Sequence, residues 1–178
     1  MKHGLIALLL LAGPAASAAT TYWTTPALLK QFFHSSQVVG AIEVLGSELA
    51  EAGMTPTKGK YLVYVGRSDG RVDGFAVVDE EKGQHMPITF GFLFDLRGRV
   101  RDVQIMTYRE PYGDGIRDRR FLDQLLGKGT GDGLKPGIDV DGVTGATISV
   151  RATTVAARRA LALCDIARRK LTASEGSG

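Results

Sequence analysis

The stretch K-Y-L-V-Y-V-G-R-S-D-G-R-V-D-G-F-A-V-V, residues 60–78, decides the fold. Aromatic and β-branched residues recur along both of its halves, as is typical of β-strands. Between the halves, Ser-Asp-Gly-Arg at 68–71 is a typical hairpin signal. Because so short a turn joins antiparallel neighbours, the stretch predicts a β-hairpin with strands at 60–66 and 72–78.

Two further strands follow this hairpin. Residues 87–96 carry three phenylalanines at alternate positions, and residues 100–108 are rich in β-branched residues. Polar turns at 80–83 and 97–99 separate the strands, and such short turns again join antiparallel neighbours. We therefore expect a four-stranded antiparallel meander, not a series of βαβ units.

Helical patterns lie on both sides of the meander. Thr25 is suited to cap a helix whose first residue is Pro26, and apolar residues at helical spacing predict further helices. These further helices span about 42–52, 117–126 and 147–171, with a flexible, glycine-containing loop at 127–137. The expected fold class is α+β, an antiparallel meander packed against helices in a single domain.

The chain divides into an export signal, an N-terminal helical segment, a main domain and a disordered tail, at 1–18, 19–58, 59–172 and 173–178. The signal has a basic start at Lys2, an apolar run too short to cross a bilayer, and small residues before the cleavage site. An uncleaved helix is the alternative. We expect cleavage after Ala18 and a periplasmic protein.

Composition excludes several classes of function. The formal net charge of +3 falls by one when Lys2 leaves with the signal, and so small a charge does not indicate a nucleic-acid partner. Cys164 is the only cysteine, so we expect no internal disulfide and a buried structural thiol. His34 and His85 are isolated in the sequence, so no metal site is expected.

The candidate chemistry lies in residues 138–149, I-D-V-D-G-V-T-G-A-T-I-S. Gly142 and Gly145 let the backbone come close to a ligand. Three hydroxyls surround the start of the last expected helix, those of Thr144, Thr147 and Ser149. Unpaired N–H groups and the helix dipole stabilise a phosphate at such a start. The alternative is that these residues only cap the helix.

The segment Asp141-Gly142-Val143-Thr144-Gly145-Ala146-Thr147 resembles the flavinylation motif of the FMN-binding domain family. The family pattern is Asp, two variable residues, Ser or Thr, Gly, Ala, then Ser or Thr, and this chain fills every fixed position. The family includes flavin-bearing subunits of the Rnf and Na+-translocating NADH:quinone oxidoreductase complexes. The resemblance implies FMN bonded to Thr147 through a phosphoester, installed by a separate FAD-dependent flavin transferase. It also implies that Asp141 orients the acceptor loop or helps to bind the transferase's metal.

The segment Tyr108-Arg109-Glu110-Pro111 resembles the one that follows the last meander strand in soluble family members. The resemblance implies that this loop lies near the flavin. Tyr108 would stack on the flavin ring, and Arg109 would offer donors to phosphate or to a flavin carbonyl. A surface loop with an Arg–Glu pair is the alternative. The expected cofactor-binding residues are Tyr108, Arg109, Glu110, Asp141, Gly142, Thr144, Gly145, Ala146, Thr147 and Ser149.

We expect an extracytoplasmic electron carrier rather than an enzyme with a substrate of its own. The sequence shows no Ser-His-Asp set, no metal cluster and no dinucleotide fingerprint. The expected partners are membrane-bound redox donor and acceptor proteins. The alternatives are a flavin-dependent reductase that acts directly on a small acceptor, and a non-redox regulatory module that retains the fold.

Overall fold

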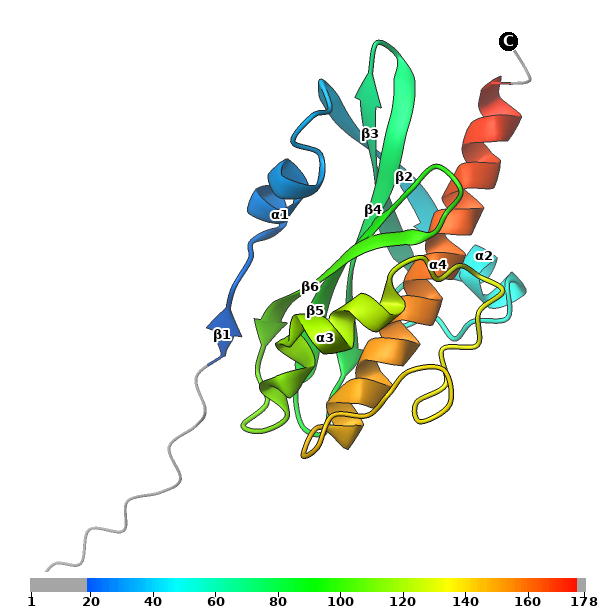
Figure 1. The fold of residues 1–178 in the computed structure, drawn as a ribbon. Helices are drawn as coiled ribbons and strands as arrows, with labels where there is room; N and C mark the ends of the chain where they lie inside the picture. The colour runs from blue at the N-terminus through cyan, green and yellow to red at the C-terminus, as the bar shows by residue number, and fades with distance from the viewer. Residues whose placement is uncertain (1–18, 176–178) are drawn as a thin grey trace, which may run out of the picture.

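The computed structural model describes residues 19–175 and contains one antiparallel sheet with helices on both faces (Figure 1). Its strands lie in the order β1-β6-β5-β4-β3-β2. They are β1 (Thr20–Thr21), β2 (Val38–Leu45), β3 (Lys60–Ser68), β4 (Arg71–Lys82), β5 (Pro87–Phe94) and β6 (Val100–Tyr108). The α+β class and the expected meander, β3 to β6, are confirmed. The expected export signal, residues 1–18, lies outside the described residues.

The β3–β4 hairpin closes through a two-residue turn. Asp69 and Gly70 have φ angles of 50° and 76°, and Ser68 pairs with Arg71 across the turn. Two consecutive positive φ angles match a type I′ turn, whose twist suits the strands that it joins. Because Asp-Gly is the local sequence signal for this turn, the hairpin could be predicted without knowledge of distant contacts.

One face of the sheet packs against α4 (Thr147–Glu175), with α3 (Arg119–Leu122) on the same side. The main hydrophobic core lies between these layers. Phe90, Phe92 and Phe94 of β5 stack in a row within it, at centroid distances of 6.1 and 6.3 Å, and all three are fully buried. The alternate phenylalanines of the sequence therefore line the α4 side of the sheet.

The opposite face of the sheet packs against α1 (Thr25–Phe32) (Figure 1). Thr24 caps this helix, since its Oγ1 accepts the Ala27 N–H at 3.4 Å, so the cap lies one residue before the expected Thr25. Leu28 is fully buried above Gly91, where an added Cβ would collide with the leucine side chain. The missing side chain lets the helix approach the sheet closely.

A buried ion cluster joins α4 to β4. The side chain of Arg159 is 2% exposed, and its Nε donates to Asp79 Oδ2 at 2.5 Å. Its terminal nitrogens donate to Glu81 Oε2 and to the Glu80 carbonyl oxygen, both at 2.7 Å. Lys58 pairs with the other carboxylate oxygen of Asp79 at 3.0 Å. The cluster therefore ties the middle of the helix to the sheet.

Two expectations about secondary structure are wrong. The expected helix at 42–52 is a strand up to Leu45, and only α2 (Gly46–Glu51) is helical. The N-terminal segment therefore supplies β1 and β2 to the sheet as well as helices. The expected helix at 117–126 is three short pieces, η1 (Asp114–Arg117), α3 and η2 (Asp123–Leu125). Asp118 interrupts it with an extended ψ of 128° and caps α3 by accepting the Arg120 N–H.

The two segments expected to be mobile also differ from the expectation. In the loop at 127–137, Leu134 is fully buried in the main core and adopts a φ of 49°. This side chain anchors the loop, and it explains why the backbone tolerates a conformation that is unusual for leucine. At the other end, α4 continues to Glu175 and so includes the first residues of the expected tail.

Candidate functional site

A tight turn leads from the motif into α4. The Ala146 N–H donates to the Val143 carbonyl oxygen at 3.0 Å, and Gly145 has a φ of 76°. A positive φ at the third turn position requires glycine in practice, which explains the central glycine of the motif. The helix then begins at Thr147. The turn therefore brings the last hydroxyl of the motif to the first position of the helix.

The start of α4 has free hydrogen-bond donors. Its first N–H with a partner is that of Val150, which donates to the Ala146 carbonyl oxygen at 2.8 Å. In residues 19–175 no acceptor faces the N–H groups of Thr147, Ile148 and Ser149. Such donors, together with the positive end of the helix dipole, favour an anion.

The three motif hydroxyls lie in different environments. Thr144 and Thr147 are exposed, whereas Ser149 is 5% exposed and its Oγ lies 2.9 Å from the Tyr108 hydroxyl. Neither threonine hydroxyl has a hydrogen-bond partner among the described residues, so neither forms a side-chain cap of α4. Thr147 is thus the one hydroxyl of the three that is both at the helix start and open to solvent.

Tyr108 connects the loop after β6 to the start of α4 through its hydroxyl group. It is 4% exposed, and its hydroxyl donates to the Tyr112 carbonyl oxygen at 2.5 Å in addition to its contact with Ser149. Burial raises the pKa of its phenol, against the lowering effect of the Ser149 hydrogen bond. The enclosed ring holds the loop and the helix together, and its stacking on a flavin stays a prediction.

A cavity of about 250 Å³ lies beside Thr147. Its lining residues are Gln84, Glu110, Tyr112, Gly145, Ala146, Thr147, Ile148 and Ser149. Glu110 is 7% exposed, and its Oε1 accepts the N–H groups of His85 and Met86 at 2.6 and 2.9 Å. The carboxylate therefore fixes the β4–β5 turn, which forms one wall. The lining includes an acidic side chain and neither lysine nor arginine.

Comparison with known proteins agrees with this geometry. The family model described as the FMN-binding domain matches residues 57–162 of the chain. The chain belongs to the FMN-binding domain family. Its fold is similar to the crystal structure of NqrC from Shewanella oneidensis, with a TM-score of 0.52 and 19% identity over 72% of this chain and 80% of that one. No curated protein matches the sequence.

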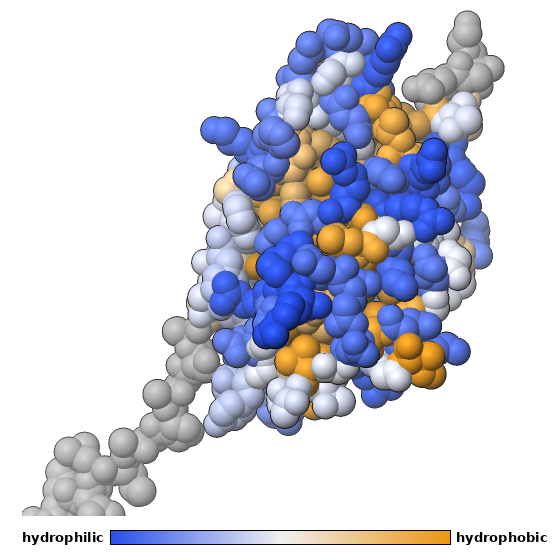
Figure 2. All heavy atoms as spheres, viewed as in Figure 1, coloured by the Kyte–Doolittle hydropathy of each residue, from blue (hydrophilic) through white to orange (hydrophobic). Residues whose placement is uncertain are grey.

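The residues present fit the phosphate end of FMN. An exposed hydroxyl, three free N–H groups and an adjoining cavity meet at Thr147. Hydrophobic spheres also lie near the lower end of the face in Figure 2, where Figure 1 places the loop before α4. Ile138, in the loop before α4, is 79% exposed, and Ile148, the second residue of α4, is 45% exposed. Apolar surface suited to a flavin ring or a partner protein therefore lies close to the motif.

The structure does not bring Arg109 to the cavity beside Thr147. Its Nη1 donates to the Pro87 carbonyl oxygen and to Thr89 Oγ1, both at 2.9 Å, and Nη2 lies 3.5 Å from Glu80. Consecutive strand residues point to opposite faces, so Arg109 points away when Tyr108 faces α4. In this conformation the guanidinium of Arg109 is bound by Pro87, Thr89 and Glu80, and the role implied by resemblance, as a donor to phosphate or flavin, stays a prediction.

Asp141 and Gly142 lie on the exposed approach to the turn. The Asp141 N–H donates to Gln124 Oε1 at 2.7 Å, while its carboxylate has no partner within residues 19–175. The carboxylate does not orient the loop in the unmodified chain and is free for an external contact. Sequence reasoning missed Gln124, as well as Gln84 and Tyr112 of the cavity, because no motif connects them to the helix start.

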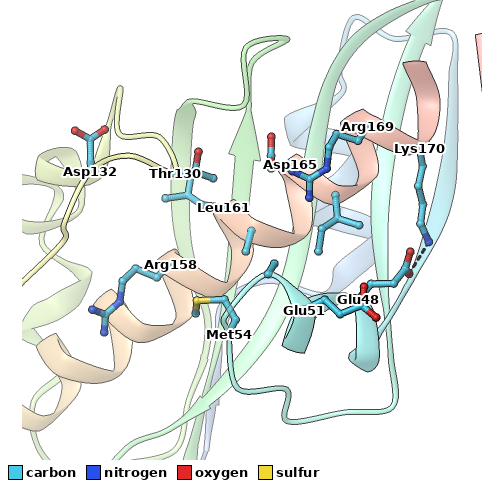
Figure 3. A pocket seen from close by; sticks show the side chains of 13 residues that line it. Glu48, Glu51, Met54, Thr130, Asp132, Arg158, Leu161, Asp165, Arg169 and Lys170 are labelled. Carbon is cyan, nitrogen blue, oxygen red and sulfur yellow. Dashed lines mark hydrogen bonds and ion pairs between the residues drawn. The ribbon is translucent and has the colours of Figure 1, made fainter. Parts of the chain in front are cut away.

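A larger cavity, of about 620 Å³, lies farther along α4 (Figure 3). Its lining on this helix begins at Arg158, roughly 16 Å beyond Thr147 at 1.5 Å per residue. Its walls hold both charges, and Lys170 donates to Glu48 at 2.6 Å. This cavity is therefore separate from the one beside Thr147. Within residues 19–175, no helix is long and apolar enough to cross a membrane, and no three acidic, His or Cys side chains gather as metal ligands.

Proposed function

We propose that Thr147 carries FMN through a phosphoester bond and that the protein transfers electrons outside the cytoplasm. The observation that carries the proposal is the contrast between the hydroxyls. Thr147 is exposed beside three free N–H groups, whereas Ser149 is buried against Tyr108. Thr144 lies one turn earlier and away from the start of the helix. The family motif and the local geometry thus favour the same oxygen atom.

The charge of the cavity also supports a covalent attachment. Free FMN ends in a phosphomonoester, which carries about −1.5 to −2 at neutral pH, and the cavity wall contributes the Glu110 carboxylate without a lysine or arginine. Esterification to Thr147 leaves a phosphodiester with one negative charge, which this environment opposes less. A covalent bond also prevents loss of the cofactor outside the cell. Bound FMN supplies the exchange of one or two electrons with partner proteins.

The proposed attachment joins Thr147 Oγ1 to the FMN phosphorus of FAD. The bond from that phosphorus to the bridging oxygen of the pyrophosphate breaks, AMP leaves, and the hydroxyl proton passes to a base of the flavin transferase. No electron is exchanged in this step. The chain contributes an accessible hydroxyl and the free carboxylate of Asp141, which is available to the transferase or its metal.

The test is co-expression with an FAD-dependent flavin transferase, followed by intact mass, visible spectrum and peptide mapping. We expect one FMN per chain on Thr147, none in Thr147→Ala, and at least partial loading in Thr147→Ser. Ser149→Ala is the matched control and should remain loaded, because its hydroxyl is buried. An adduct on Thr144 or Ser149, or one that persists in Thr147→Ala, would contradict the proposal.

Export is the second part of the proposal. The ordered basic, apolar and small-residue segments of residues 1–18 support cleavage after Ala18. Because β1 begins at Thr20, this cleavage removes no residue of the sheet. N-terminal sequencing of protein from the periplasmic fraction should begin at Ala19. A chain that retains Met1 and stays with the cytoplasmic fraction would refute the location.

A further inference from the structure

We propose that Arg151 is the cation that holds the phosphate of FMN on Thr147. This inference rests on the proposed function, since it assigns a partner to the phosphodiester. The side chain of Arg151 is exposed, and in the part of the chain that the structure describes it has no ion pair, hydrogen bond or ring contact. Its guanidinium is therefore free to bind an anion at the helix start.

Helix geometry places Arg151 within reach. Residues 147 and 151 are four apart in α4, so their Cβ atoms lie about 5–6 Å from each other on the same side of the helix. Side chains lean toward the helix N-terminus, which directs the arginine toward the threonine and not away from it. An anion before a cation at this spacing is also the favourable order along a helix.

The sign of the charge gives a second, independent reason. The first turn of α4 has no acidic residue, and Arg151 is the first charged residue of the helix. The positive end of the helix dipole therefore has no negative side chain of the first turn beside it, and Arg151 in the second turn adds a further positive charge. By contrast, α2 follows the usual rule, because Glu48 lies in its first turn and accepts the Leu45 N–H at 2.8 Å. A phosphate on Thr147 removes the conflict in α4.

The other charged groups around Thr147 leave this role to Arg151. Glu110 adds negative charge to the cavity wall, and the cavity lining has no basic residue. Arg109 binds Pro87 and Thr89 on the other face of the sheet. The three free N–H groups bind phosphate oxygens from the helix side, and a guanidinium offers a fork of donors from the solvent side. Together they neutralise the single charge of the diester.

The primary test is ³¹P NMR of the flavinylated protein. We expect the phosphodiester resonance to shift in Arg151→Ala and to return part of the way in Arg151→Lys, which restores the charge but not the fork. Arg158→Ala is the matched control, since Arg158 also lies on α4 without a partner among the described residues but borders the other cavity. Raising the salt concentration to about 1 M should move the parent resonance toward that of Arg151→Ala, because this contact is exposed.

A second measurement uses the unmodified chain and free ligands. Arg151→Ala should weaken FMN binding roughly fivefold, the effect of about 1 kcal/mol expected of an exposed ion pair, and leave riboflavin binding unchanged. An unmoved ³¹P resonance in flavinylated Arg151→Ala would overturn the inference, as would an equal loss of riboflavin binding. Peptide mapping separates the two proposals. FMN absent from Thr147 in the parent protein refutes the attachment, whereas FMN on Thr147 with an unmoved resonance refutes only the role of Arg151.

Discussion

Replacing Arg159 by methionine tests how α4 is held on the sheet. The substitution keeps a long apolar stem but removes three donors, which bind Asp79, Glu81 and the Glu80 carbonyl oxygen at 2.5–2.7 Å. Asp79 is fully buried, so it would lose its closest counter-charge inside the protein. Breaking a buried ion pair by removing one partner costs about 3–5 kcal/mol. Lys58 still pairs with Asp79 at 3.0 Å in the variant. We therefore expect a loss of stability near the lower limit of this range, about 3 kcal/mol.

The charge state of Arg159 does not weaken this expectation. Burial lowers the pKa of its guanidinium, but the carboxylates of Asp79 and Glu81 raise it, and the net shift is upward. Since the folded-state pKa lies above the unfolded one, the contribution is fully present below the unfolded value. The arginine stays charged, and its contribution to stability does not vary with pH near neutrality.

Urea unfolding of the parent and variants, followed by circular dichroism, gives the change in the free energy of unfolding. At about 2–4 °C per kcal/mol, a loss of about 3 kcal/mol should also lower the melting temperature of Arg159→Met by about 6–12 °C. Arg158→Met is the control, because the side chain of Arg158 has no partner within residues 19–175 and such changes stay within about 0.5 kcal/mol. The double variant with Asp79→Asn should lose less than the sum of the single losses. Equal stability of Arg159→Met and Arg158→Met would refute the argument.

Other parts of the molecule give shorter tests. Burial raises the pKa of Cys164 to about 12, so the thiol should react with a maleimide only after unfolding, and native-state labelling would contradict its position. Arg109→Ala should lower the melting temperature but leave the flavin spectrum unchanged, since the guanidinium faces away from the cavity; a spectral shift would contradict this. Hydrogen bonds from Lys170 and the Leu45 N–H lower the pKa of Glu48 from its usual 4.5. The stability from Glu48 is present above 4.5 and lost as pH falls through the lower folded pKa, so Glu48→Gln should flatten the acid side of a melting-temperature profile.

The meander could be predicted because its signals are local. Each strand ends in a short turn, and Asp69-Gly70 defines the tightest of them. The edge strand β2 could not be predicted, since polar and apolar residues do not alternate in its sequence V-V-G-A-I-E-V-L and only Val44 in it is buried. Its pairing is non-local, with Val38 opposite Arg67. Strand β1 is even harder to predict from the sequence, because its two residues pair with residues of β6 that lie almost 90 positions later in the chain.

The candidate site divides in the same way. The turn at Gly145 and the helix start at Thr147 follow from neighbouring residues and were placed correctly. The cavity wall could not be predicted from neighbouring residues. Gln84 belongs to a hairpin turn far from the motif in sequence, and Glu110 fixes this turn by accepting hydrogen bonds from its main-chain N–H groups. The direction of the Arg109 side chain could also have been predicted. Once Tyr108 is assigned to the buried face of β6, strand alternation directs the next residue to the opposite face.

The placement of Thr147 reconciles two requirements that usually conflict. A residue modified by another protein must be exposed, whereas a residue that fixes a cofactor must be held rigidly. Within residues 146–150, Thr147 and Ile148 are exposed, whereas Ala146 and Val150 on either side are buried at 4% and 2%. Ser149 adds its contact with Tyr108, and farther along the helix the Arg159 cluster holds α4 to the sheet. In the proposed attachment, the acceptor is thus presented by a helix already in its final position, and we expect the reaction to require no rearrangement of the fold.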